Sequence, residues 1–157
     1  MTFEESVVIR SDPAALFGLS QDYARRLEWD PFLRSARLLG EARQAGVGVR
    51  TLCVARSGWA METEYVSFSP PRTTAVKMTR GPWFLDRFAG SWHFDEVEPG
   101  RTRVSFRYSL KAWPKWLSWV LNPIFAQVFA RDTRHRLLAL KDAVERRGVL
   151  DEARAGA

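Results

Sequence analysis

Residues 90–147 constrain the fold of this chain more than any other stretch. Segments 90–97 and 103–110 alternate apolar and polar residues, which is typical of half-buried β-strands. The turn between them, at 98–101, contains a proline followed by a glycine, so the two strands are expected to form a hairpin. One face of this hairpin is apolar and must be covered by another element. Its side chains are Trp92, Phe94, Val104, Phe106 and Tyr108.

The element that follows the hairpin is predicted to be a long amphipathic helix. From position 125 to 144, apolar residues and one threonine recur every three or four positions, the period of one helical face. Asn122 before Pro123 suits a helix start and Gly148 suits a helix end, so the helix is expected to run from Pro123 to Arg147. Its apolar face consists of Phe125, Phe129, Thr133, Leu137, Leu140 and Val144.

The residues before the hairpin predict a first strand, two short helices and further antiparallel strands. A strand at 3–10 is followed by Ser11 or Asp12 as a cap and by Pro13 in a first helical turn, which predicts a helix at 14–20. Short turns separate the later strands, so one antiparallel sheet of about seven strands is expected. The remaining elements are a helix at 23–28 and strands at 35–39, 47–55, 61–68, 73–78 and 83–97.

Length and hydropathy indicate one domain. The chain has 157 residues, of which 46% are hydrophobic and seven are tryptophan, enough to bury a large core. Residues 1–147 are expected to form this domain and residues 148–157 a tail. The start of the chain is acidic, and no run of 18 apolar residues occurs, so a signal peptide and a membrane span are not expected. A cytoplasmic location follows as an expectation.

The charge of the chain is basic but scattered. The formal net charge is +6, and twenty arginines far outnumber four lysines without forming a stripe. Nucleic acid is therefore not the expected partner, because such an interface needs clustered positive charge. Attraction to anionic lipid head groups is at least as easy to justify.

Several short segments make the chain resemble a known family. Together they cover about residues 3–147, and the chain resembles the START-like helix-grip (SRPBCC) superfamily, in particular its polyketide cyclase/dehydrase and lipid-transport branch, which includes coenzyme-Q-binding proteins. The resemblance implies an α+β helix-grip fold: a curved antiparallel sheet of six or seven strands around one long C-terminal helix, with two short helices after the first strand. The segments are SDPAALF at 11–17, WDPF at 29–32, SPPR at 69–72, GSWHF at 90–94, GRTRV at 100–104 and LLALK at 137–141.

The resemblance also implies a cavity between the sheet and the long helix. Residues that alternation directs to the inner face are expected to line it, although each could equally be part of a solid core. The expected ligand is a lipid, quinone or polyketide-like compound, bound without a metal or other cofactor. The expected ligand-binding residues are Trp29, Phe32, Val76, Met78, Trp92, Phe94, Val104, Phe106, Tyr108, Phe125, Phe129 and Thr133.

The chain carries few residues with catalytic potential. His93 and His135 are expected to point away from the apolar faces of their elements, and Cys53 is alone, so no metal site is predicted. No nucleophile motif or phosphate-binding loop occurs.

A carboxylate inside an apolar cavity could still act as an acid or base. Asp86 shares the parity of the inward residues of its strand if no bulge intervenes, and Asp30 is expected at the cavity mouth. Paired with an inward arginine such as Arg50 or Arg136, either could polarise a carbonyl. Salt bridges across the rim are the alternative interpretation of these side chains.

Residues 111–125 form the most unusual segment. Trp113, Trp116 and Trp119 are spaced to share one helical face beside two lysines, and Ile124 and Val128 lie on the back of the long helix. Packing over the open end of the sheet, contact with a membrane surface, and a homodimer contact are three alternatives for these residues.

Three functions remain open from the sequence. The first is binding, and with it transport, of a hydrophobic small molecule. The second is an enzyme of the polyketide cyclase, aromatase or dehydratase type that uses the same cavity. The third is a basic module that contacts a membrane or the ribosome.

Overall fold

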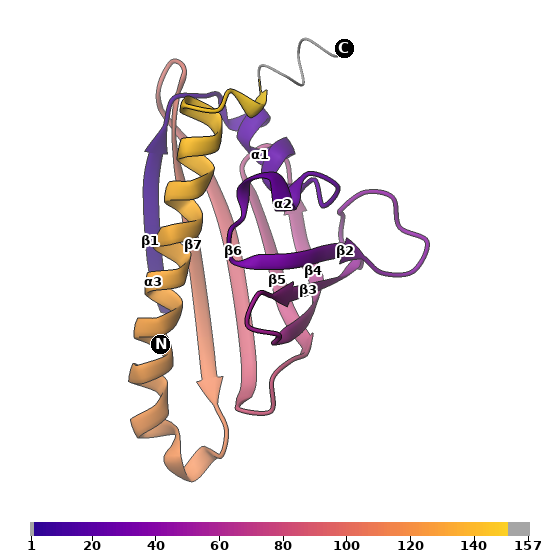
Figure 1. Ribbon diagram of the computed structural model, residues 1–157, viewed down its shortest axis with the longest axis vertical. Coiled ribbons are helices and arrows are strands. Elements are labelled where there is room, and N and C mark those ends of the chain that lie inside the picture. Colours follow the sequence, from indigo (N-terminus) through magenta and orange to yellow (C-terminus); the bar gives the residue numbers. More distant parts are fainter. Residues whose placement is uncertain (1, 151–157) are drawn as a thin grey trace.

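The computed structural model describes residues 2–150, which form a seven-stranded sheet, two short helices and one long helix (Figure 1). The expected helix-grip architecture is confirmed. In chain order the elements are β1 (Thr2–Ile9), α1 (Pro13–Gln21), α2 (Arg26–Trp29), β2 (Leu33–Leu38), β3 (Arg50–Ala55), β4 (Ala60–Ser69), β5 (Thr73–Arg80), β6 (Leu85–Glu98), β7 (Arg101–Ala112), the 3-10 turn η1 (Lys115–Leu117) and α3 (Ser118–Glu145).

All neighbouring strands are antiparallel, in the order β1-β7-β6-β5-β4-β3-β2. Strands β2 to β7 therefore form a meander, and only β1 pairs with a strand that is distant in sequence, with Val7 opposite Val104. The predicted hairpin is β6 and β7, which pair over almost their whole length. This pair supplies the centre of the face that the long helix covers.

Helix α3 does not lie over the middle of the sheet. It packs against β1 and β7, whereas β2 to β4 curl away on the other side (Figure 1). Helices α1 and α2 close one end of the space between them, with α1 against β6 and α2 against both β2 and α3. The curl of the sheet thus decides where the protein is solid and where it is hollow.

The start of α1 follows the local chemistry of the sequence. The carboxylate of Asp12 accepts a hydrogen bond of 2.7 Å from the backbone N–H of Ala15, and Pro13 occupies the first turn, where its missing N–H costs nothing. The interior face of α1 buries Leu16, Phe17 and Leu19 against the sheet.

The long helix begins earlier than the sequence predicted. It starts at Ser118 rather than Pro123, and Asn122 is inside the helix instead of capping it. The side chain of Asn122 accepts a hydrogen bond of 2.8 Å from the backbone N–H of Ala112, which ties the helix to the end of β7. Pro123 is exposed and removes one intrahelical hydrogen bond. The hydrogen bond between Asn122 and Ala112 helps to offset this loss of helix stability. The expected tail falls mostly on residues 151–157, outside the described part of the chain.

None of the helices formed by residues 2–150 is both long and apolar enough to span a bilayer.

Gly90 is a point of close approach within the sheet. It lies on β6 between Val76 of β5 and Tyr108 of β7. A Cβ atom there would come within 2.6 Å of the ring of Phe106, which is itself buried. The absence of a side chain at position 90 therefore lets an aromatic ring lie against the strand.

We expect Gly90→Ala to lower the free energy of unfolding by about 1–3 kcal/mol, because the added Cβ would displace the ring of Phe106 from its place against the strand. Chemical denaturation measures this loss. Gly46→Ala is the matched control, because a Cβ at Gly46 meets nothing within 4 Å. Equal stability of the two variants would contradict this account of Gly90.

Candidate functional site

A cavity of about 640 Å³ lies between α3 and the strands that curl away from it. This volume is within the range of small-molecule sites in proteins. Most of its wall is apolar and aromatic. Side chains of this kind come from β4, β6, β7 and α3, and include Met61, Phe88, Trp92, Phe106, Phe125 and Phe129.

Seven of the twelve expected ligand-binding residues line this cavity: Phe32, Val76, Trp92, Phe106, Phe125, Phe129 and Thr133. The other five are packed into the surrounding core. They are Trp29, Met78, Phe94, Val104 and Tyr108.

Packed helices explain why two of these five, Tyr108 and Phe94, do not reach the cavity. The phenol of Tyr108 donates to the backbone carbonyl of Ala126 in α3, 3.2 Å away, so the helix lies directly on β7 at this point. Phe94 packs against Phe17 of α1 with ring centroids 5.4 Å apart. The alternation of apolar and polar residues showed which side chains face inward. It did not show which of them are covered by a helix and which line the cavity.

The polar end of the cavity is an ion-paired cluster that we call the arginine–aspartate cluster: Arg26, Asp30 and Arg136. Asp30 Oδ2 is 3.0 Å from Arg26 Nε and 2.9 Å from Arg136 Nη2. Its other oxygen accepts a hydrogen bond from the backbone N–H of Phe32. Both arginines line the cavity, whereas Asp30 lies behind them and is 1% exposed.

The charges of this cluster hold one another in place. Burial favours the neutral form of Asp30, but Arg136 and Arg26 outweigh this effect and lower the pKa of the carboxyl below its ordinary value. Burial also opposes the charge of Arg26, but Asp30 outweighs it and raises the pKa of the guanidinium. Asp30 and Arg26 are therefore charged at neutral pH. Two positive charges against one negative charge leave an excess of +1 at the cavity wall.

Aromatic rings support both arginines. The guanidinium of Arg26 lies 4.7 Å from the ring centroid of Trp29 and donates to the backbone carbonyl of Ser20. The guanidinium of Arg136 lies 5.3 Å from the ring centroid of Phe32. Stacking of this kind stabilises a cation that has lost part of its water.

A second polar group contributes a chain of hydrogen bonds to the same wall. The phenol of Tyr65 donates to the side-chain oxygen of Gln21 at 2.6 Å and lies 3.3 Å from the phenol of Tyr23. Burial, followed by the neighbouring Tyr23, raises the pKa of Tyr65, so it stays protonated. Cys53 also lines the cavity, and burial raises the pKa of its thiol.

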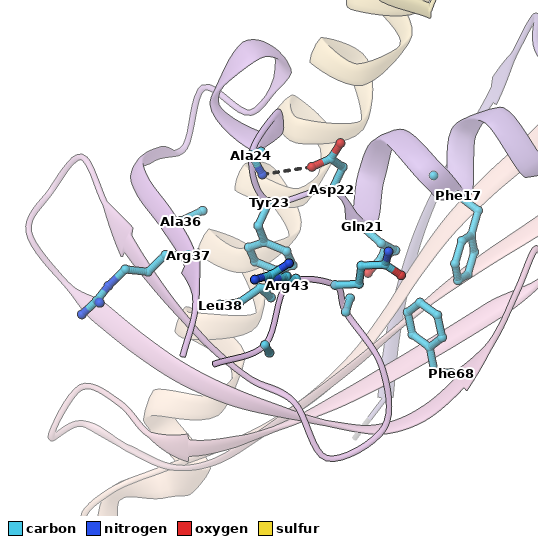
Figure 2. Close-up of a pocket in the computed structure, with 14 residues that line it drawn as sticks. Phe17, Gln21, Asp22, Tyr23, Ala24, Ala36, Arg37, Leu38, Arg43 and Phe68 are labelled. Atoms are coloured by element: carbon cyan, nitrogen blue, oxygen red, sulfur yellow. Dashed lines mark hydrogen bonds between the residues drawn. The ribbon is translucent and has the colours of Figure 1, made fainter. Parts of the chain in front are cut away.

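Gln21 and Tyr23 also line a second hollow of about 630 Å³ between α1 and the loop that joins β2 to β3 (Figure 2). Phe17 and Phe68 form one side of it, and Arg43 of the loop also lines it (Figure 2). The lining from the loop itself is small or polar, so the first cavity is the better site for an apolar molecule.

Two of the four catalytic candidates belong neither to the cavity wall nor to the arginine–aspartate cluster behind it. The pairing of β6 with β7 shifts register between Leu85 and Arg87, so Leu85 takes the buried position and Asp86 pairs with Arg87 instead. The expectation that Asp86 points inward was therefore wrong, because a bulge changes the parity. The expectation of an inward Arg50 was also wrong: its side chain is 58% exposed and pairs with Glu62.

The other two candidates, Asp30 and Arg136, are brought together as described. Sequence reasoning did not include Arg26, although its spacing of four residues from Asp30 was a signal that the two could pair on one helical turn. His93 interacts with Ser91, and His135 is exposed. Residues 2–150 contain no group of three or more His, Cys, Asp or Glu side chains able to hold a metal ion.

The five residues expected to contact a membrane or partner are all exposed. Trp113, Trp116, Trp119, Ile124 and Val128 lie at the end of the molecule where β7 passes through η1 into α3. Trp113 packs against Trp83 with ring centroids 6.4 Å apart, whereas Trp116 and Trp119 are each 76% exposed, so packing over the end of the sheet describes Trp113 better than the other two.

Comparison with known proteins agrees with the fold. The sequence matches the family described as "Polyketide cyclase / dehydrase and lipid transport" over residues 1–145. A search of curated protein sequences finds no match.

Solved structures show the same architecture at low sequence identity. A START superfamily protein from Mycobacterium smegmatis is 12% identical with a TM-score of 0.77, covering 92% of this chain and 97% of that one. The Zhui aromatase/cyclase from Streptomyces sp. R1128 is 14% identical with a TM-score of 0.75, covering 94% of both chains. The di-domain aromatase/cyclase BexL is 22% identical with a TM-score of 0.71, covering 92% of this chain and 50% of that one.

Asp30→Asn is expected to lower the free energy of unfolding by about 3–5 kcal/mol at neutral pH, because it leaves the buried guanidinium of Arg26 and the partly buried one of Arg136 without their counter-ion. Glu28→Gln is the matched control on the same short helix. Its ion pair with Arg25 is half-exposed, so a loss below about 1 kcal/mol is expected.

The pH dependence of this difference tests the charge of Asp30 directly. Its folded pKa is lowered, so its stabilisation is complete above the unfolded value of about 3.9 and is lost as the pH falls through the folded value. The difference in free energy of unfolding between the wild-type protein and Asp30→Asn should therefore become smaller below about pH 4. A stability difference that does not change with pH would contradict a charged Asp30.

Proposed function

This chain belongs to the polyketide cyclase/dehydrase and lipid-transport family, and we propose that it binds a hydrophobic small molecule with an anionic or oxygen-acceptor group at one end. The observation that carries this proposal is the cavity itself, with aromatic walls and a single cationic end. The apolar part of the ligand would lie against α3 and the sheet, and its polar end would lie near Arg26 and Arg136.

The energy of such binding comes mainly from the apolar walls. Burial of about 300 Å² of apolar ligand surface contributes about 7 kcal/mol, before the cost of association is subtracted. Lipid, quinone and polyketide-like molecules have this much apolar surface. Few polar contacts are then needed for affinity, and those present serve orientation.

The arginine–aspartate cluster supplies that orientation. Asp30 neutralises one guanidinium charge of the cluster, and one positive charge remains. Among the described side chains that line the cavity, the one carboxylate is Asp132, and it pairs with Arg131. A carboxylate, enolate or carbonyl oxygen from the ligand would complete the cluster. Such charge-assisted hydrogen bonds are stronger in a partly dry site than in water.

Cyclase or aromatase chemistry is the second candidate, supported by the same arginines. A guanidinium group can polarise a carbonyl and stabilise an enolate oxygen. Proton transfer by Asp30 does not suit this role, because a carboxyl with a lowered pKa that is bonded to two arginines is a weak base. The geometry therefore supports binding and carbonyl polarisation better than acid–base catalysis.

Filling the cavity should abolish binding. We expect Val76→Trp to reduce affinity for anilinonaphthalene sulfonate, a fluorescent dye with an apolar aromatic body and one anionic group, at least about tenfold, because Val76 lines the cavity and an indole would occupy it. Val66→Trp is the matched control, since Val66 is 48% exposed and does not line the cavity. Native mass spectrometry of the purified protein, followed by solvent extraction, would identify a co-purified molecule. Equal dye binding by the two variants would refute the cavity as the site.

Arg136→Met tests the polar end separately from the walls. We expect wild-type protein to prefer dodecanoate over dodecanol, and Arg136→Met to lose about tenfold of this preference, because the remaining Arg26–Asp30 pair is neutral. Arg56→Met is the control, since Arg56 lines the exposed rim of the same cavity. Thermal unfolding would verify that both variants fold. An unchanged preference in Arg136→Met would show that this arginine does not select the ligand.

A further inference from the structure

Three segments that are distant in sequence meet at one end of the molecule. The β5–β6 connection (81–84) and the stretch from the end of β7 through η1 into α3 (111–128) lie toward the lower end in Figure 1, and the β3–β4 turn (56–60) lies above them. Ring contacts join them. Trp83 lies 6.4 Å from Trp113 and 5.8 Å from Phe84, and Phe84 lies 4.9 Å from Trp59, measured between ring centroids.

This end carries a large exposed apolar surface. Trp116 and Trp119 are each 76% exposed and Trp83 is 68% exposed, values that are unusual for the largest apolar side chain. We call this surface the tryptophan face, and it consists of Trp59, Trp83, Trp113, Trp116, Trp119, Ile124 and Val128. A contiguous patch of this kind is typical of a surface that contacts something.

The charges around the tryptophan face have one sign. The stretch from Lys111 to Ala130 contains two lysines and no aspartate or glutamate, and the two connecting segments add Arg56 and the adjoining Arg80. None of these four basic residues forms an ion pair with a described residue. A partner that matches such a surface has an apolar part to contact the tryptophans and anionic groups to contact the lysines and arginines.

The cavity opens onto the same surface. Several residues of the tryptophan face also line the cavity, namely Trp59, Ile124 and Val128, and all three are about half-exposed. Arg56 and Ser57, also exposed, complete this rim. A molecule that leaves the cavity here passes directly into whatever covers the tryptophan face.

We infer that the tryptophan face docks onto an anionic lipid bilayer, with the tryptophan rings at the head-group boundary and Lys111 and Lys115 against the lipid phosphates. Indole rings with an apolar body and one N–H donor favour this boundary, and basic side chains near an anionic surface add to the binding energy. A second copy of the chain suits the surface poorly, because a symmetric dimer would bring eight basic groups together without a carboxylate between them.

Co-sedimentation with vesicles tests this inference on the full chain. Wild-type protein should bind vesicles of phosphatidylcholine mixed with phosphatidylglycerol and bind pure phosphatidylcholine vesicles more weakly. Trp116→Ser with Trp119→Ser should lower binding at least about tenfold, because these two rings are the most exposed side chains of the tryptophan face. Lys111→Gln with Lys115→Gln should lower binding to the anionic vesicles about 30-fold and have little effect on neutral ones.

The controls separate docking from folding and from ligand binding. Leu138→Ser with Val97→Ser removes exposed apolar side chains elsewhere, at 56% and 41% exposure, and should leave vesicle binding unchanged. The dye-binding cavity should remain intact in the Trp116→Ser, Trp119→Ser protein, so loss of docking and loss of the cavity are distinguishable. Analytical ultracentrifugation without vesicles reports the oligomeric state. Absence of vesicle binding, binding that both tryptophan and lysine variants leave unchanged, or a wild-type dimer that these variants dissociate would each overturn the inference.

Discussion

The off-centre packing of α3 on the sheet determines almost every other feature of this protein. The helix is anchored to β1 and β7 by buried apolar side chains and, through Asn122, to the backbone at the end of β7. The rest of the sheet curls away from it, and the space that remains is too large for the side chains on either side to fill. Apolar burial along β7 stabilises the fold, and the same geometry leaves an unfilled volume beside β3 to β5.

An unfilled apolar space in a protein of this size needs a rigid frame, and the arginine–aspartate cluster contributes one. Asp30 links α2 to α3 through Arg26 and Arg136, so it closes the end of the cavity at the point where two helices and the sheet meet. The pairing is asymmetric, with two guanidinium groups for one carboxylate. Under the proposed function, a structural salt bridge and a recognition element for an acceptor group would be combined in one set of residues.

The two ends of the cavity have different characters. One end is polar and built from buried charges, whereas the other opens among exposed tryptophans and unpaired basic residues. A molecule with an apolar body and one polar group would be oriented by this difference, with the polar group innermost. The same orientation serves a carrier that exchanges its ligand with a membrane and an enzyme that must place a carbonyl beside an arginine.

The sequence by itself determined the periodic elements. Alternation identified the β6–β7 hairpin, the period of α3 identified its buried face, and Asp12 and Pro13 marked the start of α1, because each of these signals depends on residues near one another in the chain. Tertiary structure decided which inward residues line a void. Phe106 and Tyr108 have the same parity on β7, yet only Phe106 reaches the cavity, because α3 covers Tyr108. The bulge that turns Asp86 away, and the meeting of Arg26 with Arg136 on a single carboxylate, likewise depend on contacts between elements distant in sequence, which no local pattern records.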